Sequence, residues 1–363
     1  MASPTHPRIL ALFQKRIEGD DSLLRLAGLR FRQAGLGTEI YAGTPDELES
    51  LWAFRPEPED LAIIHLDRGI DLLAPQSRGL IADFAHRFRG RVSGLVIHDQ
   101  REMVSQRDAY FHAVQNVASQ LERIHAGPRL FIEYAAGIEP CRFIEFFEFS
   151  RKLGCISACI DVGHVGIWQI WDCYSRNHPG EEVSGMAPDH PRIPDLVAKI
   201  QDAVHSSLPV VLGMIEALGR LAKPLHLHLH DGHPLSTLSR YGVSDHLSFL
   251  TRIPIPFEHD HKWSLDPMYG PSGLYQIISK SMEVVDPAAV SFTLEIHPAE
   301  GRLPLRDASS LFEHWKDKAN AERMNYWLSV LLENHQLVLA ARESRLASRP
   351  ELTNPPPPNT GDR

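Results

Sequence analysis

One stretch of the sequence, residues 224–233, constrains the fold more than any other. Leucine and histidine alternate strictly over residues 225–230. This period of two is typical of a β-strand, whose successive side chains point to opposite faces. Asp231 and Gly232 then end the run with a turn signal. A strand with leucines against helices and imidazoles on its inner face suits the wall of a closed parallel barrel, and an edge strand with a solvated polar face is the alternative.

Seven further short apolar runs have the composition of strands, and each is followed by a segment with helical spacing or by a long loop. These runs are residues 8–13, 38–42, 61–65, 92–98, 129–133, 156–161 and 290–296. Helices are expected at about 23–34, from 44 onward, and at about 75–88, 103–124, 140–153 and 308–347. Eight strands that alternate with helices predict an α/β fold of the (β/α)₈ TIM-barrel type.

Two segments are longer than a minimal barrel requires. Residues 168–208 are rich in Pro, Gly, His and Trp and are expected to be irregular, and residues 234–280 are expected to carry a long loop. Both follow carboxyl ends of strands, where a barrel builds its active site, so we expect them to cover a substrate. We therefore expect one TIM-barrel domain over residues 1–347, with an extended C-terminal helical region and a disordered, proline-rich tail at 348–363.

Composition narrows the class of partner. The net charge is −9 and there is no long basic run, which disfavours non-specific nucleic-acid binding. The sequence shows no signal peptide and no apolar run long enough to span a bilayer. Its four cysteines have no paired spacing, which indicates reduced thiols. We expect a cytoplasmic protein with a small-molecule substrate and no membrane partner, and a homo-oligomer stays open.

Six successive expected strands carry a histidine or a carboxylate at or near their carboxyl ends. These residues are His65, His98, Glu133, Asp161, His228 and Glu295. Each of them alone is often a structural residue, but burying so many ionisable groups at one rim is costly unless they pair or bind metal. Mixed carboxylate and imidazole ligands suit divalent ions such as Zn²⁺, Mn²⁺ or Mg²⁺. The conjunction therefore predicts a divalent-metal site.

The motifs around these residues resemble those of the xylose isomerase-like TIM barrels. That superfamily includes sugar phosphate isomerases and epimerases and the endonuclease IV type of abasic-site nucleases. The resemblance rests on Phe131-Ile-Glu133-Tyr, Cys159-Ile-Asp161-Val-Gly-His164, the histidine-rich run 226–231 and Thr293-Leu-Glu295-Ile. It covers about residues 8–300 at the level of motifs, and the loops and the segment 168–208 do not match.

The resemblance implies a single divalent ion (Mn, Mg, Co or Zn) held by four ligands. These are Glu133, Asp161, His228 and Glu295. His164 would lie beside them as a ligand or a substrate contact. His228 is chosen from the histidine-rich run because it stands three residues before Asp231, as the family ligand does. His226 would then lie deeper and His230 would point at substrate, while His230 and Asp231 are also candidates for additional metal or substrate contacts.

The two branches of the superfamily imply different chemistry. In the isomerase branch the metal polarises a carbonyl, and Glu133 and Glu295 remove and return a proton on the neighbouring carbon. In the nuclease branch up to three Zn²⁺ ions activate water against a phosphodiester, which would recruit His65, His98 and His246. Asp245-His246 departs from the family's Asp-x-His spacing.

We expect a metal-dependent isomerase or epimerase of a sugar or polyol, because the acidic charge and the long loops favour a small substrate over a duplex. An endonuclease IV-like zinc phosphodiesterase acting on abasic DNA is the alternative. A non-catalytic barrel used for binding is the third reading, and failure to bind any divalent metal would support it.

Overall fold

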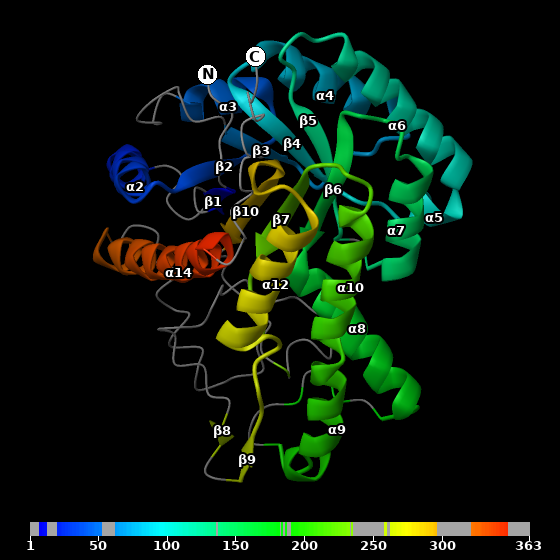
Figure 1. Cartoon of the computed structure of the whole chain (residues 1–363), viewed down its shortest axis with the longest axis vertical. Coiled ribbons are helices and arrows are strands. Elements are labelled where there is room, and N and C mark those ends of the chain that lie inside the picture. Colours follow the sequence, from blue (N-terminus) through cyan, green and yellow to red (C-terminus); the bar gives the residue numbers. More distant parts are fainter. Residues whose placement is uncertain are drawn as a thin grey trace, which may run out of the picture.

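Eight parallel strands close into a barrel (Figure 1), in the order β1-β10-β7-β6-β5-β4-β3-β2, with β2 paired back onto β1. The computed structural model describes residues 7–12, 20–52, 62–135, 137–181, 183, 186, 190–232, 234, 258–259, 262–295 and 321–347. The barrel strands are β1 (Arg8–Leu12), β2 (Gly37–Ala42), β3 (Ala62–Leu66), β4 (Val92–His98), β5 (Arg129–Glu133), β6 (Ile156–Asp161), β7 (Leu225–Leu229) and β10 (Val290–Glu295). The predicted (β/α)₈ TIM barrel is confirmed.

Helices surround the barrel and connect its strands (Figure 1). They are α2 (Asp21–Ala34), α3 (Pro45–Trp52), α4 (Pro75–Arg87), α5 (Glu102–Ser105), α6 (Arg107–Glu122), α7 (Pro140–Phe149), α8 (Val162–Asn177), α9 (Ile193–His205), α10 (Ser207–Gly219), α12 (Gly270–Val284) and α14 (Ala321–Ala347). A short 3₁₀ helix, η1 (Pro287–Ala289), precedes β10, and β8 (Glu258–His259) pairs antiparallel with β9 (Trp263–Ser264). Helix α14 packs against both α12 and α2, which places this part of the expected C-terminal helical region in the outer layer of helices.

The segment 168–208 differs from the expectation of irregular structure. Helix α8 runs to Asn177, and α9 and the start of α10 occupy residues 193–208. Apolar residues at helical spacing cause this, because α9 buries Ile193, Leu196 and Ile200 on one face. The proline, glycine and histidine content had concealed that periodicity. The helix expected over 103–124 is also two helices, because Gln106 leaves the helical region at φ −131° and ψ 45°.

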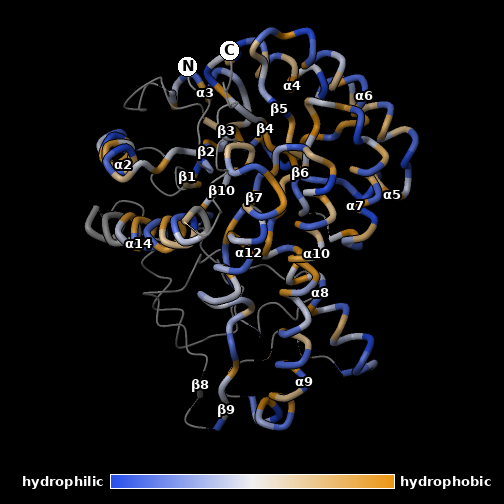
Figure 2. The backbone as a smooth tube through the Cα atoms, viewed as in Figure 1, coloured by the Kyte–Doolittle hydropathy of each residue, from blue (hydrophilic) through white to orange (hydrophobic). Residues whose placement is uncertain are grey.

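The barrel interior below the strand ends is filled by side chains. Leu10, Ile63, Val96, Phe131 and Cys159 form a small buried cluster inside the strands, separate from the larger core between strands and helices. Gly94 makes room for it, since a Cβ at that position would lie 2.6 Å from Cε2 of Phe131. Figure 2 shows hydrophobic residues along the strands, whereas the outer helices alternate between hydrophobic and hydrophilic residues. Inward residues above this cluster are therefore left to form a site.

Several sequence-based expectations lie outside the described residues. They concern Asp245-His246, the first part of the C-terminal helical region at 308–320 and the tail at 348–363. Among the described helices, none combines the length and the apolar character needed to cross a membrane.

Candidate metal centre

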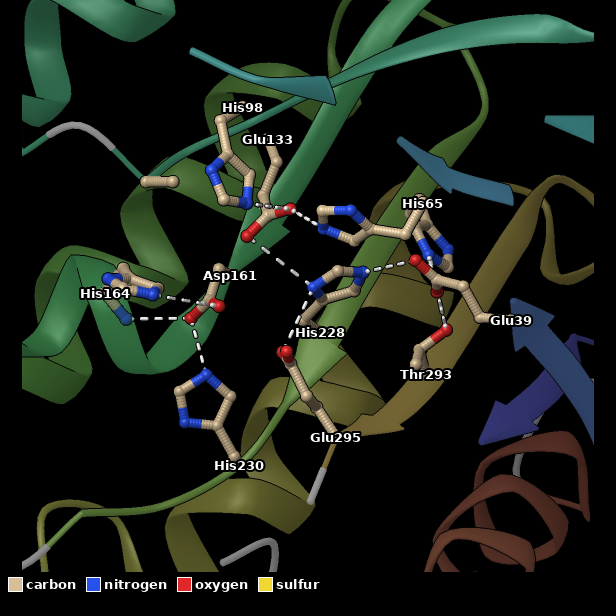
Figure 3. A network of polar contacts seen from close by, with 12 residues as sticks. Glu39, His65, His98, Glu133, Asp161, His164, His228, His230, Thr293 and Glu295 are labelled. Carbon is tan, nitrogen blue, oxygen red and sulfur yellow. Dashed lines mark hydrogen bonds and ion pairs between the residues drawn. The ribbon is translucent and has the colours of Figure 1, made fainter. Parts of the chain in front are cut away.

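The six residues singled out at strand ends meet at one end of the barrel (Figure 3). Four of them are the last residues of their strands: His98 of β4, Glu133 of β5, Asp161 of β6 and Glu295 of β10. His65 and His228 are the penultimate residues of β3 and β7. The ladder register places His98 beside Glu133 and Asp161 beside His228. Parallel strands in register thus bring together side chains that are far apart in the sequence.

Asp161, His228 and Glu295 form a group that we call the core subsite. Each offers one ligand atom, and these atoms lie within 4.8 Å of one another. Nδ1 of His228 is 3.2 Å from Oε2 of Glu295 and 3.7 Å from Oε1 of Glu133. Two ligands of one zinc ion, at bond lengths of about 2.0–2.2 Å, lie roughly 3.3–4.4 Å apart. The spacing therefore suits a single ion shared by Glu133 and the core subsite.

The hydrogen bonding of the core subsite also fits a cation. Nδ1 of His228 and Oδ2 of Asp161 are buried and form no hydrogen bond with any residue that the structure describes. Buried polar atoms of native proteins normally have a partner. A nitrogen that faces two carboxylates needs a positive charge at that position, supplied either by a proton on the ring or by a metal ion in its place. A divalent cation bound here would give Nδ1 of His228 and Oδ2 of Asp161 the partner that each lacks among the described residues.

His65, His98 and Glu133 form a second group, the rim subsite, whose ligand atoms also lie within 4.8 Å of one another. Oε2 of Glu133 is 2.8 Å from Nε2 of His65 and 3.6 Å from Nε2 of His98. Nδ1 of His65 is 2.9 Å from the carbonyl oxygen of Leu66, to which it donates, so Nε2 is the ligand atom. Glu133 consequently presents one oxygen to each subsite.

His164 and His230 both contact Asp161. Oδ1 of Asp161 accepts from the backbone N–H of His164 (2.8 Å), which caps α8, and from Nε2 of His230 (2.7 Å). The ring of His164 lies at the rim, with Nε2 3.6 Å from Oδ2 of Asp161. The ring of His230 is fully buried against Gly163, where a Cβ would fall 1.7 Å from its Cε1. His230 therefore orients Asp161, whereas the sequence had suggested that it points at substrate.

Asp231 has a structural role, since it accepts hydrogen bonds from the backbone. Its two oxygens accept hydrogen bonds from the backbone N–H groups of Gly232, Tyr269 and Gly270 at 2.7–3.0 Å. The last two of these stand at the start of α12, so Asp231 fixes that helix to the end of β7.

Burial and neighbouring charges set the protonation of the centre. Burial by itself lowers the pKa of His228, but interactions with Cys159 and with the carboxylates of Glu39, Glu133 and Glu295 outweigh that effect and hold the pKa well above its ordinary value. Burial lowers the pKa of His98 to about 4, and Glu133 offsets only part of that effect. For Asp161, burial raises the pKa, but the charges of His164 and His230 outweigh it and the net shift is downward. Asp161 is thus ionised and His98 neutral near pH 7, which are the forms that bind metal.

Glu39 is a buried residue of this network that the sequence patterns did not identify. Glu39, in the middle of β2, contacts Nε2 of His228 (3.1 Å) and Nε2 of His226 (3.0 Å), and Oγ1 of Thr293 donates to it. The only signal was a single carboxylate inside the apolar run 38–42. Glu39 lies one layer below the strand ends, so a search for polar residues at strand ends does not find it.

Comparison with known proteins assigns no family to this chain. A scan of the sequence against models of protein families finds no match. A search among proteins of curated function finds no relative. Function must therefore be argued from the site.

Proposed function

We propose that this protein is a divalent-metal-dependent enzyme of the xylose isomerase-like TIM barrels, acting on a sugar or polyol-type small molecule as an isomerase or epimerase. The observation that carries the proposal is a group of three side chains whose ligand atoms lie within 4.8 Å of one another, with Glu133 3.7 Å from one of them. Two of these ligand atoms, Nδ1 of His228 and Oδ2 of Asp161, are buried and without a hydrogen-bond partner among the described residues. The four ligands are Glu133, Asp161, His228 and Glu295.

A bound divalent ion would polarise the carbonyl group of the substrate. The proton on the neighbouring carbon then needs a base, and Glu295 at the end of β10 is our candidate. The expected pairing of Glu133 with Glu295 as two bases is less favoured by the geometry, because His65 engages Oε2 of Glu133 at 2.8 Å. One carboxylate that takes a proton from one carbon and returns it to the next performs an isomerisation, whereas epimerisation needs a second acid on the opposite face. The arrangement favours isomerisation.

The depth of the site supports a small substrate. Side chains of His98 and His164 are 21% and 25% exposed, whereas those of the core subsite are at most 7% exposed. A substrate must therefore present a narrow group to reach the metal ligands. The net charge of −9 also disfavours a polyanionic duplex.

The rim subsite favours a second candidate, an endonuclease IV-like zinc phosphodiesterase acting on abasic DNA. Glu133 presents Oε2 to His65 and His98 and Oε1 to His228, as a carboxylate shared by two ions would. Two-metal sites are common in enzymes that cleave phosphodiesters. The third reading, a barrel used only for binding, predicts that no divalent metal is retained.

Metal content and proton exchange together test the proposal. Elemental analysis of protein purified without added metal should give about one Mn, Mg, Co or Zn per chain. A panel of aldoses, ketoses and polyols should then be incubated in D₂O, where the right substrate gains deuterium next to its carbonyl. Two or three Zn per chain, with cleavage of abasic DNA and no exchange on any sugar, would transfer the assignment to the phosphodiesterase. Absence of both metal and exchange would contradict both enzymes.

A further inference from the structure

A fully buried carboxylate lies beneath the core subsite. Glu39 on β2 is 1% exposed, and donors from β7 and β10 surround it. Oε1 is 3.1 Å from Nε2 of His228, Oε2 is 3.0 Å from Nε2 of His226, and Oγ1 of Thr293 also donates to Oε2. Figure 3 shows Glu39 on the side of the His228 ring opposite Glu133 and Glu295. An ionised group at this depth is tolerated only with such partners.

The hydrogen bonds of Glu39 decide which nitrogen of each histidine carries a proton. Three donor groups surround the two oxygens of Glu39, namely the hydroxyl of Thr293 and the Nε2 atoms of His226 and His228. A buried carboxylate with donors on both of its oxygens is the acceptor of these hydrogen bonds. Both Nε2 atoms must therefore donate to it. His226 agrees with this assignment, because the hydroxyl of Ser291, 2.7 Å away, is then free to donate to its Nδ1.

The consequence for His228 concerns its other nitrogen. With Nε2 bonded to Glu39, Nδ1 faces the space between Glu133 and Glu295, at 3.7 Å and 3.2 Å from their oxygens, and is the nitrogen at which a metal ion would replace a proton. We propose that Glu39 is the positioning residue of the metal centre: it fixes the tautomer and ring orientation of His228, making His228 an Nδ1 ligand, and increases its basicity through a carboxylate–imidazole–metal chain. This inference rests on the metal binding of the proposed function but not on the reaction catalysed. Carboxylates that accept from the second nitrogen of a metal-bound histidine act in this way.

The alternative to this proposal is that the same histidines, with a cysteine, bind a soft metal ion deeper in the barrel. Cys159, His226 and His228 each offer a ligand atom within 4.8 Å of the others. Burial raises the pKa of the Cys159 thiol, and His228 offsets only part of that effect. The Nε2 atoms of both histidines are already bonded to Glu39. The observations thus favour the carboxylate–imidazole arrangement.

Co²⁺ titration followed by visible absorption tests the proposal. The wild-type protein, Glu39→Gln, Glu39→Ala and a control, Ser157→Ala, are compared. Ser157 is a buried residue near the start of β6, at the other end of that strand from Asp161, and its hydroxyl donates to the carbonyl of Pro224. Loss of an outer-shell partner typically weakens metal binding by about 10–100-fold, so we expect a Kd increase in that range for Glu39→Gln and a larger one for Glu39→Ala. Both should shift the Co²⁺ bands, and Ser157→Ala should show the wild-type Kd and spectrum.

A second readout addresses the tautomer directly. In Zn²⁺-loaded protein with ¹⁵N-labelled histidine, His228 should show a protonated Nε2 and a metal-bound Nδ1, and Glu39→Gln should alter the Nε2 proton signal. A merely structural role for Glu39 would leave both spectra unchanged after correction for stability.

The outcomes separate this inference from the proposed function. Folded Glu39 variants with wild-type Kd and Co²⁺ bands would overturn it, as would a sulfur-to-cobalt charge-transfer band from Cys159. If Glu39→Ala does not fold, Glu39→Gln decides, because it is nearly isosteric. A wild-type protein that binds no divalent metal would overturn both proposals. A Glu39-dependent Co²⁺ site without isomerase or epimerase activity would leave this inference standing and overturn only the function.

Discussion

The core subsite and the rim subsite use the same kinds of ligand but hold them differently. His228 of the core subsite is fully buried and its second nitrogen meets a carboxylate, Glu39. His65 of the rim subsite is oriented by a neutral backbone carbonyl, and the side chain of His98 is 21% exposed. Preorganisation by charged and buried partners makes the tighter metal site. If the protein binds metal as we propose, we therefore expect the core subsite to hold the resident ion and the rim subsite to accept a second ion or a substrate group that exchanges.

The largest effect should come from the candidate base. We expect Glu295→Gln to reduce kcat by about 10²–10⁴-fold or to abolish it, because the amide cannot accept the proton. Glu133→Gln should also abolish turnover, through the loss of a shared ligand. Steady-state kinetics at saturating metal, with circular dichroism to confirm folding, measures both. Turnover retained in Glu295→Gln would remove that residue from the mechanism.

Replacing one histidine in each subsite compares how much each subsite contributes to the metal affinity. His228→Ala should weaken metal binding by at least about 100-fold, because it removes a ligand and leaves Glu39 buried without its partner. His98→Ala should weaken it by about tenfold or less, because that ring lies at the rim. Competition with a chelator gives both affinities. Equal losses would erase the distinction between the subsites.

Metal stoichiometry sharpens the same comparison. If one resident ion occupies the core subsite, His65→Ala and His98→Ala should keep about one ion per chain. Elemental analysis after gel filtration provides the number. A fall from two ions to one in these variants would show that the rim subsite holds its own ion, in favour of the phosphodiesterase.

The pH dependence of metal affinity should follow the core subsite. Negative neighbours hold the pKa of His228 above its ordinary value despite burial, so below that raised pKa a proton competes with metal for the ring. Each competing proton weakens the apparent affinity about tenfold per pH unit as pH falls. His98, with a pKa of about 4, stays neutral down to about pH 6 and adds no such dependence. Co²⁺ titrations from about pH 8 to pH 6 test this, and a flat profile would contradict it.

The smallest effect is expected outside both subsites. Asp231→Ala removes the acceptor for three backbone N–H groups at α12 and should lower the free energy of unfolding by about 1–2 kcal/mol. Its metal affinity should equal that of the wild type. Urea unfolding and Co²⁺ titration measure the two quantities, and a loss of affinity would make Asp231 part of the centre.

The strands and the polar residues at their ends could be predicted because both follow from local patterns. Alternation identified β7, and a polar residue at the end of an apolar run identified Glu133, Asp161 and Glu295. Barrel closure then forces such residues to meet.

The partners that orient these ligands could not be predicted in the same way. Glu39 and His228 are 189 residues apart, and their contact depends on which layer of the closed barrel each inward side chain occupies. The role of Asp231 depends on where α12 begins, and the helical character of 168–208 was hidden by residues that usually break helices. Sequence patterns locate candidate ligands better than they locate the residues that orient them.

Asp161 links strand β6 of the barrel wall to helix α8 outside it. The same oxygen that accepts from His230 also accepts from the first turn of α8, the helix that leads to α9 and α10. Helix α8 cannot tilt at its origin without turning the carboxylate. Anyone who transplants this centre into another scaffold must therefore carry the opening turn of α8 with it, including Gly163, whose missing side chain lets His230 approach. The smallest unit that can be transferred is therefore strand β6 together with the first turn of helix α8.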